Sequence, residues 1–184
     1  MNEDEVVART REWLEKAVIG LNLCPFAKAV YVKNQVRIVV STARHLDGLL
    51  EELDRELDTL ASADPDVVDT TLLVHPTLLP DFLDFNDFMQ LAEAAVDEHG
   101  LEGVIQIASF HPAFQFEETA PDDIGNYTNR APFPTLHLLR EASIARAVAA
   151  FPEAETVYER NIETLKALGL AGWQALWNQS RNGR

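Results

Sequence analysis

Apolar residues recur three or four positions apart in four stretches of the chain. This spacing places them on one face of a helix, and it predicts amphipathic helices over about residues 3–22, 46–60, 84–99 and 158–168. Gly169 directly follows the last stretch and is a typical helix end. Each of these helices needs a second layer of the protein to cover its apolar face.

Short runs of β-forming residues lie between these helices. Thr70–His75 and Val104–Phe110 are apolar, meet a His-Pro pair at their ends and are predicted to be buried strands. Val30–Val32 and Val36–Ser41 are also rich in β-forming residues. The interruption at residues 33–35 predicts a tight hairpin between these two runs.

Residues 111–133 break the pattern. They contain Pro, Gly, Asn and Asp without any period, which predicts an unusually long loop. Their aromatic residues argue against disorder, so a functional role better explains the length of the loop. Pro134 then suits the first position of a further helix, which is predicted to reach about Ala150.

Strands that alternate with helices predict an α/β fold. We expect a mixed, largely parallel sheet of about four strands with helices packed on it, plus C-terminal helices. The length suits a single domain over residues 1–184, with a core at about 3–168 and a tail at 169–184. The hydrophobic fraction of 47% is enough for a sizeable core without disulfides or metals.

The chain is strongly acidic, with a formal net charge of −15. No Lys or Arg occurs between Arg55 and Arg130, so a basic groove for nucleic acid or for an anionic membrane is not expected. No apolar run approaches the roughly 18–20 residues that span a bilayer, and no signal peptide is visible. These features predict a cytoplasmic protein. They leave its cofactor and oligomeric state open.

Histidines mark the ends of both predicted buried strands. His111 follows Val104–Phe110, and His75 closes the other strand. Ligands of open α/β sheets bind beyond the carboxyl ends of the strands, so the two imidazoles could face one crevice. His111 is the candidate general acid or base, oriented by Glu117 or Glu141. The alternative, favoured for His75, is a hydrogen bond from each imidazole to the backbone.

The predicted helix after the loop carries a second set of candidates. His137, Arg140 and Glu141 are spaced to share one of its faces. Guanidinium groups bind carboxylate or phosphate through paired hydrogen bonds, and asparagines stand beside two of the arginines. The candidate substrate-binding residues are Asn126, Asn129, Arg130, His137, Arg140, Arg160 and Asn161. Alternatively, the arginines form structural ion pairs with Glu117, Asp122, Asp123 and Glu141.

Two further kinds of chemistry have weaker signals. His111, His137 and Glu141, with Asp122 or Asp123, are suitable ligand types for a metal, but no tight metal signature is present and we assign no metal site. The single cysteine, Cys24, ends the first predicted helix, where the helix dipole raises the thiol pKa. A buried structural cysteine is the better interpretation, and a nucleophile near His111 is the alternative.

Four segments of the chain together resemble one known family. They are Leu23–Ala27, Gln106–Glu117, Asn126–Glu141 and Glu159–Ile162. The resemblance is to the bacterial family of domains of unknown function numbered 1415, and it extends from about Trp13 to Leu168. It implies that these segments are signature segments of the family, and it implies no activity, substrate or cofactor.

Three hypotheses therefore stand. The first is an enzyme that acts on a small anionic metabolite through the His, Arg, Asn and Glu residues above. The second is a non-catalytic binding or protein-interaction domain, in which the same residues form a structural polar network. The third is a metal-dependent enzyme with a site of two histidines and a carboxylate.

Overall fold

The computed structural model describes residues 1–151 and 156–178, so residues 179–184 of the predicted tail lie outside it. Helices and strands alternate through the middle of the described chain, with successive helices at both ends. In order they are α1 (Glu3–Trp13), η1 (Leu14–Ile19), α2 (Ala27–Val32), β1 (Val36–Val40), α3 (Leu46–Ser62), β2 (Thr70–Val74), α4 (Phe82–Glu98), β3 (Ile105–Phe110), η2 (Ile124–Asn129), β4 (Thr135–Arg140), α5 (Glu141–Ala150) and α6 (Val157–Asn178).

A mixed four-stranded sheet forms the centre of the fold, in the order β1-β2-β4-β3. β1 and β2 are parallel, with Ile38 beside Leu72. β4 runs antiparallel to both of its neighbours, β2 and β3. The predicted α/β class and the number of strands are confirmed, but the expectation of a largely parallel sheet is wrong because β4 returns between two strands of the opposite direction.

β4 is also where the predicted helix from Pro134 to Ala150 is wrong in its first half. Thr135–Arg140 is a strand, and the helix begins only at Glu141. Both faces of this central strand are covered, so apolar residues occupy successive positions and the two-residue alternation of a half-exposed strand is absent. Pro134 precedes the strand, where it removes no hydrogen bond of the ladder, and its carbonyl accepts from the His75 N–H.

The predicted hairpin is likewise wrong. Ala27–Val32 is a short helix, and Val36–Val40 pairs with β2. The β-branched residues of α2 favour a strand, but in six residues local propensity is easily outweighed by tertiary contacts. One such contact is the hydrogen bond from the Tyr31 hydroxyl to Glu15. Asn34, with a φ of 57°, then turns the chain into β1.

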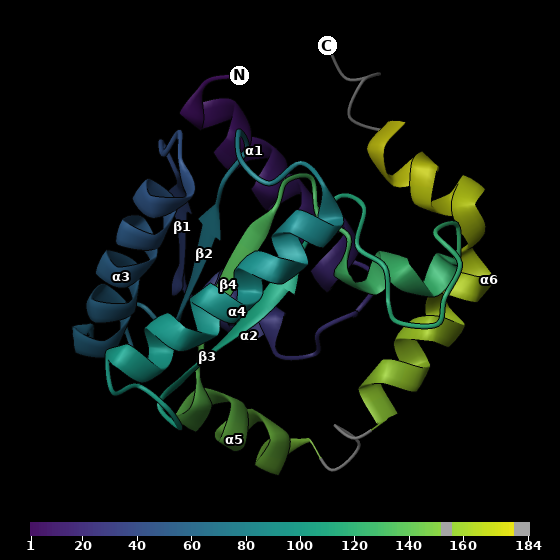
Figure 1. The fold of residues 1–184 in the computed structure, drawn as a ribbon. Helices are drawn as coiled ribbons and strands as arrows, with labels where there is room; N and C mark the ends of the chain where they lie inside the picture. The colour runs from purple at the N-terminus through teal and green to yellow at the C-terminus, as the bar shows by residue number, and fades with distance from the viewer. Residues whose placement is uncertain (152–155, 179–184) are drawn as a thin grey trace.

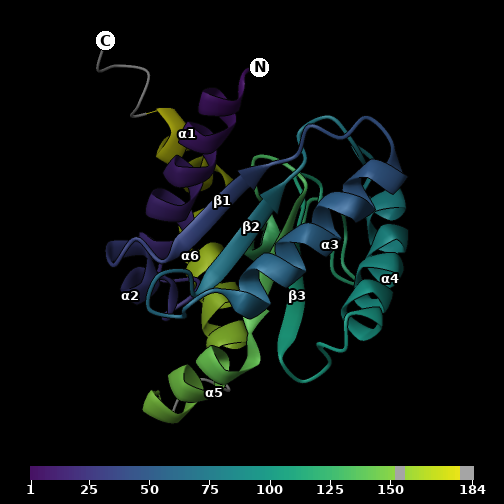
Figure 2. The same cartoon turned by 90° about the vertical axis from the view of Figure 1, so that its left-hand side faces the viewer.

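Each face of the sheet is covered by its own layer of helices (Figures 1 and 2). α3 and α4 cover one face, where Leu73, Phe85 and Leu138 are fully buried. α1, η1 and α6 lie on the other side, around a second core that includes Trp13 and Leu72. α5 lies apart from both layers, at the bottom of Figure 1.

The remaining predicted helices are confirmed with small shifts of their ends. The first continues from α1 into η1, a rare π-helical turn. A Cβ atom at Gly20, which follows this turn, would lie 2.3 Å from the Lys16 carbonyl oxygen, so this position requires glycine. Gly169, with φ 66° and ψ 172°, interrupts α6 where the helix end was predicted. None of the helices in the described ranges is both long and apolar enough to cross a membrane.

Candidate functional site

His111 is buried behind the long loop, and both of its ring nitrogens are hydrogen-bonded. The residue is 1% exposed. The Ala113 N–H donates to Nδ1 at 3.0 Å, so the ring proton is on Nε2, which donates to the Leu79 carbonyl at 3.0 Å. Burial lowers the pKa of His111, which keeps the ring neutral. These contacts hold the loop, and the predicted acid–base role gains no support from them.

His75 lies close to His111, but inside the protein core. The Phe85 ring contacts both imidazoles, with centroid distances of 5.7 Å to His75 and 5.1 Å to His111. His75 is fully buried, and burial lowers its pKa to about 4. β2 and β3 point the same way, so the two strand ends do bring the histidines together. They meet under α4, away from any crevice described below.

The arginines that were expected to hold an anion are engaged elsewhere. Arg130 donates to the carbonyls of Phe114 and Pro121, and its guanidinium lies over the Tyr127 ring, with Cζ 4.1 Å from the centroid. Arg140 donates to the carbonyls of Ala63 and Val68, at the opposite end of β4. Arg160, on α6, also has a neighbouring partner. Arg130 and Arg140 therefore do not converge on one anion site.

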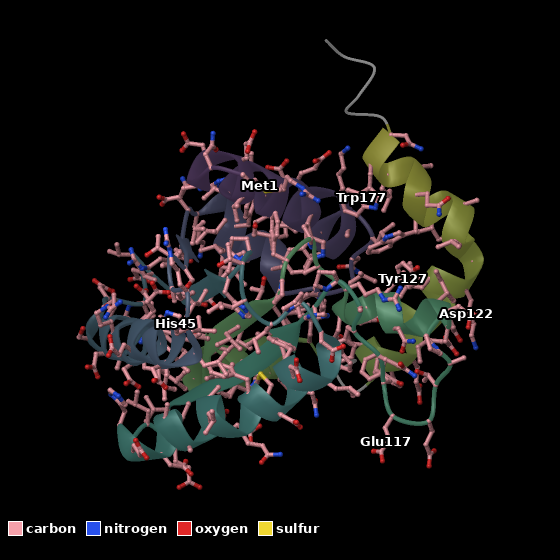
Figure 3. All side chains as sticks on the ribbon, turned by 45° about the horizontal axis from the view of Figure 1, so that its top comes forward. Met1, His45, Glu117, Asp122, Tyr127 and Trp177 are labelled. Atoms are coloured by element: carbon pink, nitrogen blue, oxygen red, sulfur yellow. The ribbon has the colours of Figure 1, made fainter. Side chains whose placement is uncertain are left out.

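Asn126 organises the long loop and is completely buried. Its Oδ1 accepts from the Phe116 N–H and the Thr119 hydroxyl, and its Nδ2 donates to the Ala120 carbonyl. Glu117 lies between these contacts but points outward from the loop (Figure 3). The amide thus replaces backbone partners that the irregular loop cannot supply.

We expect Asn126→Ala to lower the free energy of unfolding by about 2 kcal/mol, because buried backbone groups would lose their partner. Asn86 is exposed on α4, so Asn86→Ala is the matched control and should change stability by less than about 0.5 kcal/mol. Urea unfolding of both variants measures the difference. Equal stability of the two would contradict a structural role for Asn126.

The predicted helix face and metal ligands are not brought together. His137 is on a strand and Glu141 begins α5, so they do not share a helical face. His111 packs against Phe82 of α4, whereas His137 contacts Phe110 on the opposite face of the sheet. Among residues 1–151 and 156–178, no group of three or more His, Cys, Asp or Glu residues is placed to hold a metal ion.

A large cavity lies on the face of the sheet opposite α3 and α4. Its volume is about 1020 Å³, and its walls come from η1, α2, α5 and the strands. Most of the lining is apolar and includes Leu14, Val18, Leu72 and Phe110. Known small-molecule sites have volumes of roughly 300–1,000 Å³ and similarly apolar walls. This hollow has the size and lining of a ligand site.

α2 and α5 form two walls of this cavity and are themselves only partly buried. Neither helix has a single buried residue. Their ends meet where Phe26 and Phe151 make an edge-to-face contact, with ring centroids 5.8 Å apart. Ile144 and Ala147 of α5 line the cavity instead of touching a second layer. An apolar helix face normally packs on other side chains, so this space is suited to an apolar guest.

His137 lines this cavity and has one ring nitrogen without a partner in the described part of the chain. The Thr70 hydroxyl donates its one hydrogen to the Leu138 carbonyl at 2.7 Å, so it can only accept from Nε2 of His137, also at 2.7 Å. The ring proton is therefore on Nε2. Nδ1 has no partner in the described part of the chain and is not sealed from solvent. Burial lowers the pKa of His137 to about 4, so Nδ1 is a neutral hydrogen-bond acceptor at pH 7.

Charged residues around the cavity balance one another. Lys33, Arg140 and Arg146 line it, and so do Asp64, Asp66 and Asp69. Arg140 is engaged by backbone carbonyls, and Arg146 donates to the Ser143 hydroxyl. The cavity thus offers no excess positive charge to an anion, in a protein whose net charge is already −15.

A smaller recess of about 210 Å³ lies beside the large cavity and shares Val18, Cys24 and Phe110 with it. Its other lining residues include Thr128, Asn129 and Asn161. Cys24, Asn129 and Asn161 were all predicted as site residues from the sequence, and here they do come together.

Cys24 precedes α2, and its thiol is not activated. Burial raises the pKa of the Cys24 thiol, and hydrogen bonds from the backbone N–H groups of Phe26 and Ala27 only partly offset this. The sequence had suggested the end of the first helix as the cause of a raised pKa, whereas burial is the main one. At neutral pH the thiol of Cys24 is protonated, and the residue serves as part of the lining of the two hollows.

The family model described as "Protein of unknown function (DUF1415)" matches residues 5–175. The chain belongs to the DUF1415 family. This confirms the resemblance stated from the sequence. Comparisons with curated proteins and with solved structures each find no match. All four segments that carry the DUF1415 resemblance contribute to the two hollows, through Cys24, Phe110, His137 and Asn161 among others.

Sequence reasoning missed Thr70 and Thr128. Thr70 fixes the tautomer of His137, but it stands at the start of an apolar run and was assigned only to a strand. Thr128 lines the recess from within the long loop. No local pattern marks either residue. The partner of Thr70 is 67 positions away, and the other residues that line the recess with Thr128 come mostly from distant segments of the chain.

Proposed function

We propose that this DUF1415 protein binds a small, neutral and mainly apolar molecule in the large cavity, with His137 as its polar anchor. The observation that carries the proposal is an apolar cavity of about 1020 Å³ in which one neutral imidazole offers an unpartnered Nδ1. A ligand with a hydroxyl or N–H group could donate a hydrogen bond to that nitrogen. Its apolar part would pack against the side chains of α2 and α5 that line the cavity.

The charges support a neutral ligand over the anionic metabolite that the sequence suggested. A carboxylate would have no donor at Nδ1 and no net positive charge around it. The low pKa of His137 also makes Nδ1 a weak base, so the geometry supports hydrogen bonding more than proton abstraction. Non-catalytic binding, which is part of the second hypothesis from the sequence, is therefore the function proposed here, and the proposed ligand site is the cavity and not the strand end at His111 that the first hypothesis used.

N-phenyl-1-naphthylamine tests the proposal, since it is apolar, carries one N–H donor and becomes fluorescent in apolar surroundings. We expect saturable binding with a Kd of about 10–100 μM, as typical binding energies per non-hydrogen atom imply. The related anion 8-anilinonaphthalene-1-sulfonate has the same rings plus a sulfonate, and it should bind at least about tenfold more weakly. Absence of saturable binding of the neutral probe would refute the proposal.

Two variants of α5 locate the bound probe. Ala147 lines the cavity, so Ala147→Trp should weaken binding about fivefold or more by filling part of the space. Ala145 is exposed on the same helix and does not line the cavity, so Ala145→Trp is the matched control and should leave the Kd unchanged. Equal binding to both variants would place the probe outside the cavity.

A further inference from the structure

The recess beside the cavity has mainly apolar walls and carries no charge, but three uncharged polar side chains lie among them. Thr128, Asn129 and Asn161 provide its polar groups, and its remaining walls are Val18, Leu23, Cys24 and Phe110. The recess adjoins the large cavity, because Val18, Cys24 and Phe110 line both. A ligand in the cavity could therefore extend a small group into the recess.

The polar groups of the recess are only partly used by the protein. The Thr128 hydroxyl is buried and has no hydrogen-bond partner. Asn129 and Asn161 each donate from Nδ2 to one backbone carbonyl, that of Ser109 at 3.2 Å and that of Leu23 at 2.8 Å. Nothing else in the described chain bonds to these two amides, so each retains an Oδ1 acceptor and a second N–H.

Asn161 makes the recess a fixed feature of the fold. It is 5% exposed, and its bond to Leu23 ties α6 to the segment that carries Cys24. The open positions of its amide are therefore held in place before any ligand arrives. Buried polar groups in native proteins are nearly always hydrogen-bonded, so donors and acceptors left open at one spot indicate a missing partner.

We infer that this recess is a second subsite that takes the uncharged polar head, a primary carboxamide or a similar group, of the same ligand that fills the cavity. This rests on the proposed function, and it makes the ligand an amphipathic molecule. A carboxamide has both donors and an acceptor, which match the open groups of Thr128, Asn129 and Asn161. An ionised head would be buried here without a counter-charge.

Displacement of N-phenyl-1-naphthylamine by two neutral competitors of similar length tests the inference. Octanamide carries a carboxamide, and methyl octanoate has no donor. We expect octanamide to bind about tenfold more tightly, and because its N–H could also donate to His137, the Thr128 variant below assigns the preference to the recess. If both compete equally, the recess is not a polar subsite, while binding of an apolar molecule in the cavity stands. If the naphthylamine itself does not bind, the proposed function fails first.

Thr128→Val separates binding from stability. Valine has the same shape and removes a hydroxyl that has no partner in the free protein, so stability should be unchanged or increased. Octanamide affinity should fall about fivefold, with naphthylamine affinity unchanged. Thr77→Val is the control, since Thr77 is exposed and lines neither hollow. An unchanged preference for octanamide in Thr128→Val would overturn the inference.

Discussion

Between pH 7.5 and pH 4, the free energy of unfolding is expected to fall by about 6 kcal/mol because of two buried histidines. In the unfolded chain His75 and His137 bind a proton near the ordinary pKa of 6.5, whereas in the folded protein burial lowers the pKa of each to about 4. This stability is fully present above about pH 7.5, where the histidines are neutral in both the folded and the unfolded state. It is lost as the pH falls to about 4, since only the unfolded state gains protons in that range.

Each histidine contributes about 3 kcal/mol to this loss, which is its pKa shift multiplied by 1.4 kcal/mol per pH unit. His111 acts in the same direction. His99 acts in the opposite direction, because its hydrogen bond with Asp58 raises the pKa of His99 and acid strengthens that pair. Urea unfolding at several pH values between 7.5 and 4.5 measures the sum.

The His137→Leu variant isolates the contribution of His137 to the pH dependence of the free energy of unfolding. The variant should lose about 3 kcal/mol less than the wild-type protein over the same pH range, since one proton is no longer taken up on unfolding. Carboxylates titrate equally in both proteins and cancel in the difference. His45 is exposed at the surface (Figure 3), so His45→Leu is the matched control for the loss of one imidazole. If His137→Leu behaves like His45→Leu, the imidazole of His137 is not held neutral by burial.

The sequence predicts the helices that have one apolar face, and it fails at segments whose neighbours decide their structure. α3 and α4 have regular apolar spacing because one side of each helix packs on the same face of the sheet. β4 carries apolar residues toward both faces, so its pattern is compatible with a helix as well as with a strand. α2 is too short for its own residues to determine its conformation.

Prediction from the sequence has the same limit at the candidate site. The sequence finds the segments that matter, since His137, Cys24, Asn129 and Asn161 all reach one of the two hollows. It does not find which residues remain free to bind. His111 and Asn126 have the residue types of a catalytic site, but their polar atoms are bonded to backbone groups of the loop and of Leu79. That distinction depends on contacts between distant segments, and no spacing along the chain records it.

His137→Leu is also expected to weaken binding of N-phenyl-1-naphthylamine by about tenfold or more, because the N–H of the probe would lose its acceptor in an apolar site. The substitution leaves Thr70 bonded to the Leu138 carbonyl, so the sheet should remain intact. Stability at pH 7 should not fall substantially, since leucine suits this apolar wall better than an imidazole does. A loss of binding with preserved stability would assign the effect to the missing nitrogen.

His137→Asn extends the comparison, because an asparagine carbonyl can accept a hydrogen bond although it lies nearer the backbone. It should recover part of the lost affinity, whereas His45→Leu, which alters an exposed histidine far from the cavity lining, should bind as the wild-type protein does. Fluorescence titration of the four proteins at pH 7 gives the Kd values. If leucine at position 137 binds the probe as tightly as histidine does, then the cavity recognises only apolar surface, and His137 is buried there for its bond to Thr70 alone.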